Sequence, residues 1–191
     1  FDEVITGWGR TGSPFAAQEF NVTPDIMTLA KATTNGVVPM GVVAIRDGIY
    51  DTVVDSAPKG AIELFHGYTY SGIPAAVAAA LAVQDILEKE NIFNKVKNIS
   101  PYFQEALHSL RDLDCIENIR GYGLLGGVDI KKKDKPGNAG FQVYRACYEN
   151  GVNFKATGDA LVLAPPFISE KKHIDEIFFK IRKGINQYMR Q

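Results

Sequence analysis

A lysine between an apolar run and a turn is the first candidate for chemistry in this sequence. Lys31 follows the apolar run 25–29, has an alanine on each side, and precedes the turn-rich segment TTNGVVPM. An accessible but partly desolvated amine is a good nucleophile toward carbonyl carbons, because burial or a nearby positive charge favours its neutral form. Lys31 is therefore a candidate for covalent catalysis, and a solvated loop lysine is the alternative interpretation.

Asp2 and Val4 are the second candidate group, and they lie in a strand expected over residues 1–5. A carboxylate at a strand end can pair with the protonated nitrogen of a heterocyclic cofactor, while a neighbouring valine packs on the ring face. The alternative interpretation is that Asp2 only caps the end of the strand.

The segment HGYTYSGIP, residues 66–74, gathers hydroxyl groups and backbone N–H groups just ahead of an expected helix. The first N–H groups of a helix have no partner within the helix, so such a segment can hold an anion such as a phosphate. A capped turn without a ligand uses the same residue types, and both interpretations stay open.

Strands and helices are expected to alternate around these candidates, which favours an α/β fold. Residues 25–29 and 41–45 are expected as strands on either side of Lys31. Pro74 opens an alanine-rich helix that runs to about residue 90. The remaining expected elements are a helix over 101–113, glycine-interrupted strands over 119–130, a helix over 141–149, a hairpin over 152–164 and a final helix from about 169.

Composition limits the possible partners. The 191 residues are 46% apolar and 23% charged, and 21 Lys and Arg against 22 Asp and Glu leave a net charge of -1, so no global field attracts nucleic acid or lipid. The longest apolar run, 75–83, falls far short of the roughly 20 residues of a membrane span. The cysteines and histidines lack metal-ligand spacing, and the lysine-rich segment 131–138 is expected to be an exposed loop. We expect a cytoplasmic protein with a small-molecule partner, without a metal, nucleic acid or membrane.

Three motifs, DEVITGWGRTG, LAKATTNGVVPMGVV and HGYTYSGIPAAVAAALA, occur in this order along the chain. Together they resemble the C-terminal half of a class III aminotransferase, a pyridoxal-phosphate enzyme of fold type I. The resemblance extends through GYGLLGGVDI and GDALVLAPPFIS to the last helix, and HGYTYSG is similar to the omega-amino acid:pyruvate group, which includes beta-alanine:pyruvate aminotransferases. It implies that residues 1–99 end a large cofactor-binding domain with its long connecting helix, and that 100–191 form a small α/β domain.

The resemblance also implies a role for each candidate residue. Lys31 would hold pyridoxal phosphate as a Schiff base and move a proton between the substrate carbon and the cofactor carbon. Asp2 would keep the pyridine nitrogen protonated, and Val4 would pack on one face of the ring. Thr69 would reach the cofactor phosphate in the neighbouring subunit of a homodimer, with Tyr68 supplying a backbone N–H.

Two positions depart from the pattern of that group. The group usually continues SGHP, whereas this chain has Ile73. Where the group usually has an arginine for the substrate carboxylate, this chain has Lys155, which keeps the charge but loses the bidentate fork. Lys155 is a candidate substrate-binding residue, and a solvated strand lysine is the alternative.

The sequence starts without methionine and within an expected strand, so we expect a fragment. In the family, the upstream half supplies a Gly-Ser turn for the phosphate, an aromatic residue on the other ring face and much of the dimer contact, so this chain alone is expected to be inactive. The expected activity is transfer of an amino group from an omega-amino acid or amine to pyruvate or another keto acid. A diamine, ornithine-type or biotin-pathway aminotransferase and a non-catalytic remnant are the alternatives.

Overall fold

The chain folds into two compact units that each combine helices with a small antiparallel sheet. The computed structural model describes residues 1–62, 64–131 and 135–190. The first unit comprises Phe1–Gly9 and Ser13–Ile92, and the second comprises Arg10–Gly12 and Phe93–Gln191. The mixture of helix and strand in both units is the expected α/β character, while the domain division after residue 99 stays a prediction.

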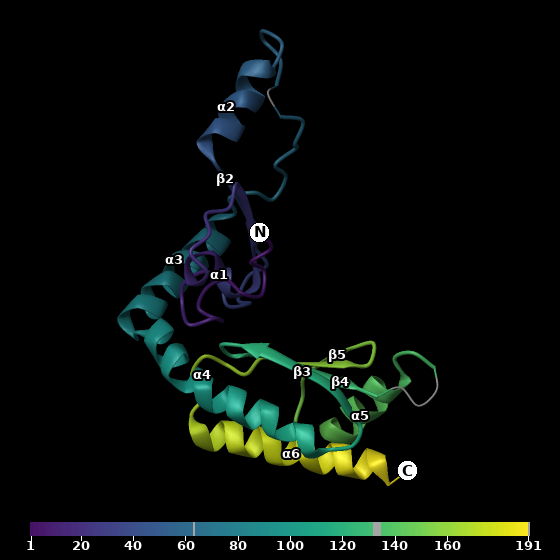
Figure 1. Ribbon diagram of the computed structural model, residues 1–191. Coiled ribbons are helices and arrows are strands. Elements are labelled where there is room, and N and C mark those ends of the chain that lie inside the picture. The colour runs from purple at the N-terminus through teal and green to yellow at the C-terminus, as the bar shows by residue number, and fades with distance from the viewer. Residues whose placement is uncertain (63, 132–134, 191) are drawn as a thin grey trace. The chain divides into compact units, whose positions relative to one another are not determined.

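The first unit is built around a two-stranded ribbon (Figure 1). In this ribbon β1 (Ile26–Leu29) pairs antiparallel with β2 (Val42–Ile45). The connection between the strands starts with a 3-10 turn, η1 (Lys31–Thr33), against which α3 (Pro74–Lys89) packs. The short helix α1 (Ala16–Glu19) and the exposed helix α2 (Asp47–Ser56) complete the unit.

The expectation of a strand over residues 1–5 is wrong, because only one of these residues pairs with a strand. Asp2 forms an isolated parallel bridge with Thr28 of β1, and turns follow from residue 4 onward. The Val4 N–H donates to the Asp2 carboxylate over 3.0 Å, which closes a local turn in place of a strand ladder. The Glu3 side chain is buried, and its carboxylate accepts the first two N–H groups of α1 over 3.0 and 2.7 Å.

The second unit is a four-stranded antiparallel sheet with helices packed against it (Figure 1). The strand order is β3 (Ile116–Tyr122), β4 (Leu125–Ile130), β6 (Ala160–Leu163) and β5 (Lys155–Thr157). The helices are α4 (Ile92–His108), α5 (Asn138–Glu149) and α6 (Lys171–Met189), with a 3-10 turn, η2 (Ser109–Asp112), after α4. Buried and half-buried residues alternate along β4, which is typical of a sheet with one face on a core.

Strand glycines allow α4 to approach the sheet closely. A Cβ on Gly126 would lie 2.7 Å from a methyl group of Leu107, which is fully buried, so any larger residue at that point of β4 would displace this leucine side chain. The core of the second unit surrounds Leu107 and is aliphatic and aromatic: Val96, Phe103, Leu110, Leu124, Val128, Ile130, Val143, Leu161, Ile174, Ile181 and Ile185. The strands expected over residues 119–130 are therefore present as β3 and β4, and the glycines lie within these strands and in the turn between them.

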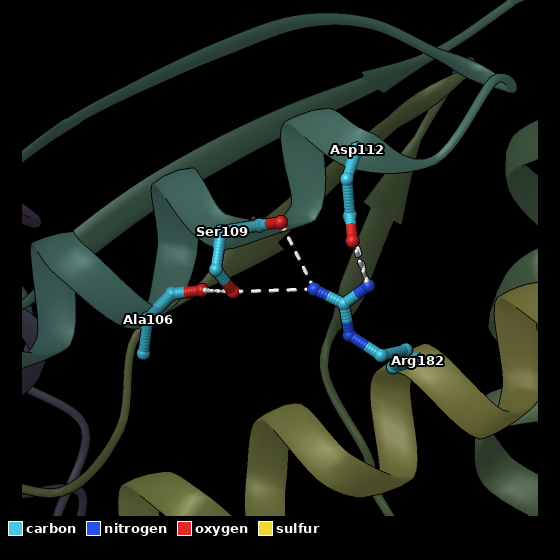
Figure 2. A network of polar contacts seen from close by, with 4 residues as sticks. All are labelled: Ala106, Ser109, Asp112 and Arg182. Atoms are coloured by element: carbon cyan, nitrogen blue, oxygen red, sulfur yellow. Dashed lines mark hydrogen bonds and ion pairs between the residues drawn. The ribbon is translucent and has the colours of Figure 1, made fainter.

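Arg182 fastens α6 to the turn that follows α4 (Figure 2). Its guanidinium donates to both carboxylate oxygens of Asp112 over 2.8 Å and to the Ser109 carbonyl over 2.9 Å. The Ser109 hydroxyl in turn donates to the Ala106 carbonyl over 2.7 Å. One guanidinium thus joins α6 to both a carboxylate and a carbonyl of η2.

Several element boundaries differ from the expectations. Helix α4 begins nine residues before the expected start and contains Pro101, which the sequence interpretation placed at a helix start. Helix α6 begins at Lys171, and Glu170 and His173 form its capping box. Residues 152–154 are not a strand, and α1 and α2 were not predicted. Of the expected loop 131–138, residues 132–134 lie outside the described residues.

No helix within the described ranges is long and apolar enough to cross a lipid bilayer.

Candidate active site

Lys31 lies at the start of η1, two residues beyond the end of β1. Its φ is +45°, in the left-handed region, which costs a non-glycine residue about 1–2 kcal/mol. The side chain is exposed, and within the described part of the chain its Nζ has no hydrogen bond or ion pair. An accessible amine on a strained backbone position is a candidate for function, because such strain persists only where the surroundings enforce it.

Two buried threonines hold the turn that carries Lys31. The Thr33 hydroxyl donates to the Ala30 carbonyl over 2.9 Å and accepts the Trp8 indole N–H over 2.9 Å. The Thr34 hydroxyl donates to the Val38 carbonyl over 2.5 Å. Sequence reasoning missed both threonines, although two hydroxyl residues immediately after the candidate lysine and its neighbouring alanine were a visible signal.

Asp2 lies beside β1 at the level of Thr28, three residues before Lys31. Its Oδ1 accepts the N–H of Val4 over 3.0 Å and the hydroxyl of Thr28 over 3.5 Å. The Asp2 carboxylate therefore closes a local turn, and its role as a cofactor ligand stays a prediction. Its Oδ2 has no hydrogen-bond partner among the described residues, and no ion pair within them joins Asp2 to Lys31. Val4 is half-buried in the turn that follows.

The loop before α3 exposes Tyr68 and Thr69. The Tyr68 N–H donates to Nδ1 of His66 over 2.9 Å, and the rings of these two residues are 4.5 Å apart. The N–H expected to bind a phosphate thus has an acceptor, which a phosphate would have to displace. The Thr69 hydroxyl has no hydrogen-bond partner in the described ranges. Ile73 is the N-cap of α3 and makes no side-chain cap bond.

Lys155 belongs to the second unit, whereas the other candidates belong to the first. It is the first residue of β5, opposite Val162 of β6. Its side chain is exposed and forms no ion pair within residues 1–62, 64–131 and 135–190. The position suits either a solvated lysine or a cation that is available to an anionic ligand.

Arg10 is a half-buried cation that sequence reasoning did not single out. Its guanidinium donates to the carbonyls of Leu124 over 3.0 Å and Pro165 over 2.6 Å, and it lies 4.4 Å from the centre of the Phe167 ring. Burial lowers the pKa of Arg10 to about 10, because desolvation disfavours the charged form. These contacts hold residues 10–12 within the second unit. The signal in the sequence that could have pointed to Arg10 was its place between the glycines of GWGRTG.

Two comparisons of the amino-acid sequence with known proteins agree with each other. Residues 1–185 match the family described as aminotransferase class-III. An omega-aminotransferase of Caulobacter vibrioides is 43% identical over 188 residues, which cover 98% of this chain and 43% of the relative. An omega-amino acid–pyruvate aminotransferase of Pseudomonas putida is 40% identical, and the match covers 99% of this chain and 42% of the relative. The chain thus spans less than half the length of these relatives.

Solved structures agree with this assignment. An (S)-enantioselective omega-transaminase from Thermomicrobium roseum superimposes with a TM-score of 0.89 at 33% identity, covering 98% of this chain and 43% of that one. A transaminase with L-alanine gives a TM-score of 0.92 at 29% identity, covering 99% and 46%. The fold is therefore the partial fold type I architecture that the motifs predicted. On the family match and the identity to its relatives together, the chain belongs to the class III aminotransferases.

Proposed function

We propose that this chain is the C-terminal part of an enzyme that transfers an amino group from an omega-amino acid or an amine to pyruvate or another keto acid. The family depends on pyridoxal phosphate. The Pseudomonas putida relative is named for an omega-amino acid and pyruvate. The observation that carries the proposal concerns two opposite charges, Lys31 and Asp2. Asp2 pairs with β1 and Lys31 follows β1, yet no ion pair joins the two side chains within the described residues.

Lys31 and Asp2 fit pyridoxal phosphate because each retains an atom that the cofactor requires. Nζ of Lys31 is exposed and can bind the aldehyde carbon of the cofactor. Oδ1 of Asp2 is engaged by Val4 and Thr28, which orients the carboxylate and leaves Oδ2 to accept from a protonated ring nitrogen. The half-buried Val4 side chain is available to pack on the ring.

The bound cofactor supplies an electron sink for negative charge on the substrate carbon. Nζ of Lys31 would anchor the cofactor covalently and, as a general acid and base, would carry a proton to and from the substrate carbon. Asp2 would hold the proton of the ring nitrogen. Thr69 would donate its hydroxyl to the phosphate bound by a neighbouring subunit, and Tyr68 would add its N–H in place of its bond to His66. Lys155 would attract the substrate carboxylate as a point charge.

A homodimer with shared active sites is part of the proposal. Large apolar side chains of the first unit are unusually exposed: Val37 at 74%, Tyr70 at 86% and Phe65 at 97%. Because the chain spans less than half of its relatives, we expect the 191-residue chain alone to catalyse no amino transfer. A cytoplasmic location, and the division into a cofactor-binding part up to residue 99 and a small domain beyond it, complete the proposal.

Absorption spectroscopy of the full-length protein mixed with pyridoxal phosphate tests the assignment of Lys31. We expect a visible band in the wild type that Lys31→Ala abolishes and Lys155→Ala retains. Lys155→Ala should raise KM for amino donors that carry a carboxylate but not for simple amines, because only the former need the cation. A band that survives Lys31→Ala would refute the assignment.

The replacement of the usual arginine by Lys155 also favours a second candidate, a class III aminotransferase with a different donor, such as a diamine. Activity profiling across beta-alanine, diamines and ornithine with pyruvate separates the two. A preference for beta-alanine supports the proposed function, and a strict preference for a diamine supports the alternative. A full-length protein without any cofactor band would be a non-catalytic remnant.

A further inference from the structure

We infer that Trp8 and Thr33 position Lys31 through a hydrogen-bond relay that ends on the peptide bond just before the lysine; this inference rests on the proposed role of Lys31. The Trp8 Nε1–H donates to the Thr33 hydroxyl over 2.9 Å. The same hydroxyl donates to the Ala30 carbonyl over 2.9 Å, and the Thr33 backbone N–H donates to that carbonyl over 3.0 Å. Thr33 therefore donates two hydrogen bonds to one carbonyl. Trp8 orients the hydroxyl that makes one of these two bonds.

The Ala30 carbonyl matters because it belongs to the peptide plane that contains the Lys31 nitrogen. Rotation of this plane about the bond between the Lys31 nitrogen and Cα is, by definition, a change in the φ of Lys31. That φ is +45°, a value that a lysine leaves unless its surroundings hold it. Donors that fix the carbonyl therefore fix the direction in which the Lys31 side chain leaves the backbone.

Trp8 is itself held in place, so its indole N–H has a preset direction. Its backbone N–H donates to the Pro14 carbonyl over 2.6 Å, and its ring meets the edge of Phe15 at 5.2 Å between centroids. Thr33 is only 3% exposed, so water cannot easily replace the indole as donor to its hydroxyl. A hydroxyl that accepts one bond while donating another also polarises both bonds in the same sense.

Trp8 and Thr33 act through Lys31 and are positioning residues. Without the indole donor, the Thr33 hydroxyl can rotate away from the Ala30 carbonyl, and Lys31 then populates orientations that do not present Nζ to the cofactor. The fraction of competent protein sets the apparent cofactor affinity, so the affinity falls in proportion to that fraction. Trp8→Phe keeps an aromatic ring against Phe15 and removes only the donor.

A mutant cycle in the full-length protein tests the relay. The readouts are the apparent dissociation constant of pyridoxal phosphate from the visible band, kcat and KM for amino transfer, and the melting temperature by circular dichroism. We expect Trp8→Phe and Thr33→Val each to weaken cofactor binding by about three- to tenfold, the range that corresponds to one lost neutral hydrogen bond. The double variant should bind no more weakly than Thr33→Val alone, because the two residues act in series.

Two further variants separate positioning from general destabilisation. Thr33→Ser retains a hydroxyl that both accepts and donates, and should bind the cofactor within about twofold of the wild type. Thr52→Val removes a comparable hydroxyl, which donates to a carbonyl over 2.7 Å on the exposed helix α2, and should leave affinity and kcat unchanged.

The outcomes distinguish the inference from the proposed function. Wild-type affinity in Trp8→Phe, with the band still dependent on Lys31, would overturn the relay and leave the role of Lys31 intact. Losses that follow the melting temperature alone, without rescue by Thr33→Ser, would show a merely structural contact and also overturn it. A wild-type protein without any band would overturn the proposed function, and the relay with it.

Discussion

Replacing Gly184 by alanine tests the close packing of α5 against α6. Gly184 is a buried residue of α6 that faces Cys147 of α5. A Cβ at this position would lie 2.6 Å from Sγ of Cys147 and 2.8 Å from both its Cα and its backbone nitrogen. Two of these three atoms belong to the backbone, so rotation of a side chain cannot relieve the overlap and the helices would have to separate.

Two effects of opposite sign decide the result. Alanine is favoured over glycine within a helix by about 1 kcal/mol. Overpacking of a close-packed interior costs about 1–3 kcal/mol, and the cost lies at the upper end when backbone has to move. We therefore expect Gly184→Ala to lower the free energy of unfolding by about 2 kcal/mol.

Urea unfolding followed by circular dichroism measures this change, and Gly48→Ala is the matched control. Gly48 is also a helical glycine, on α2, but nothing lies within 4 Å of the Cβ that the substitution would add. Only the helix preference then remains, so the control should raise the free energy of unfolding by up to about 1 kcal/mol. Stabilisation by Gly184→Ala similar to that of Gly48→Ala would refute the close approach of α5 and α6.

Three further perturbations follow from single contacts. Burial raises the pKa of the Cys147 thiol from 9.0 to about 12, so the native state keeps a proton that the unfolded chain releases. From pH 9 to 12 the free energy of unfolding should therefore fall by up to about 1.4 kcal/mol per pH unit through this group. Equal slopes in wild type and Cys147→Ala would contradict this. Arg182→Lys loses the two-oxygen contact shown in Figure 2 and should cost about 1 kcal/mol in urea unfolding, against almost nothing for the exposed Arg111→Lys; equal effects would exclude a role for the contact. The carboxylate of Asp159 accepts backbone N–H groups over 2.9 and 3.1 Å at the start of α5, so Asp159→Asn should lower the melting temperature by several degrees, and an unchanged value would rule out a stabilising charge there.

Local periodicity predicted the elements whose burial pattern is regular. The apolar stripe of the last helix predicted a buried face, and Ile174, Ile181 and Ile185 are all fully buried. The strand expected over residues 1–5 failed because the Asp2 side chain competes for the Val4 N–H, a choice that an apolar pattern does not encode. Helix α2 was missed because no residue in it is buried, so no face had to be apolar.

The candidate residues came from motifs, whereas their surroundings depend on contacts between distant parts of the sequence. Trp8 and Thr33 are 25 positions apart, and the carbonyls that hold Arg10 are 114 and 155 positions away. Periodicity reports only neighbours within a few residues, so neither the relay to Lys31 nor the burial of Arg10 was predictable from it. The sequence did indicate the charge types at Lys31, Asp2 and Lys155, because residue identity alone carries that information.

The central claim is that Lys31 binds the cofactor covalently, and reductive trapping measures this most directly. The full-length protein is mixed with pyridoxal phosphate, reduced with borohydride, digested and analysed by peptide mass spectrometry. We predict one dominant modified peptide, carrying the adduct on Lys31, with little on exposed lysines such as Lys155 or Lys171. An unmodified Lys31, or an adduct spread evenly over the exposed lysines, would contradict the account.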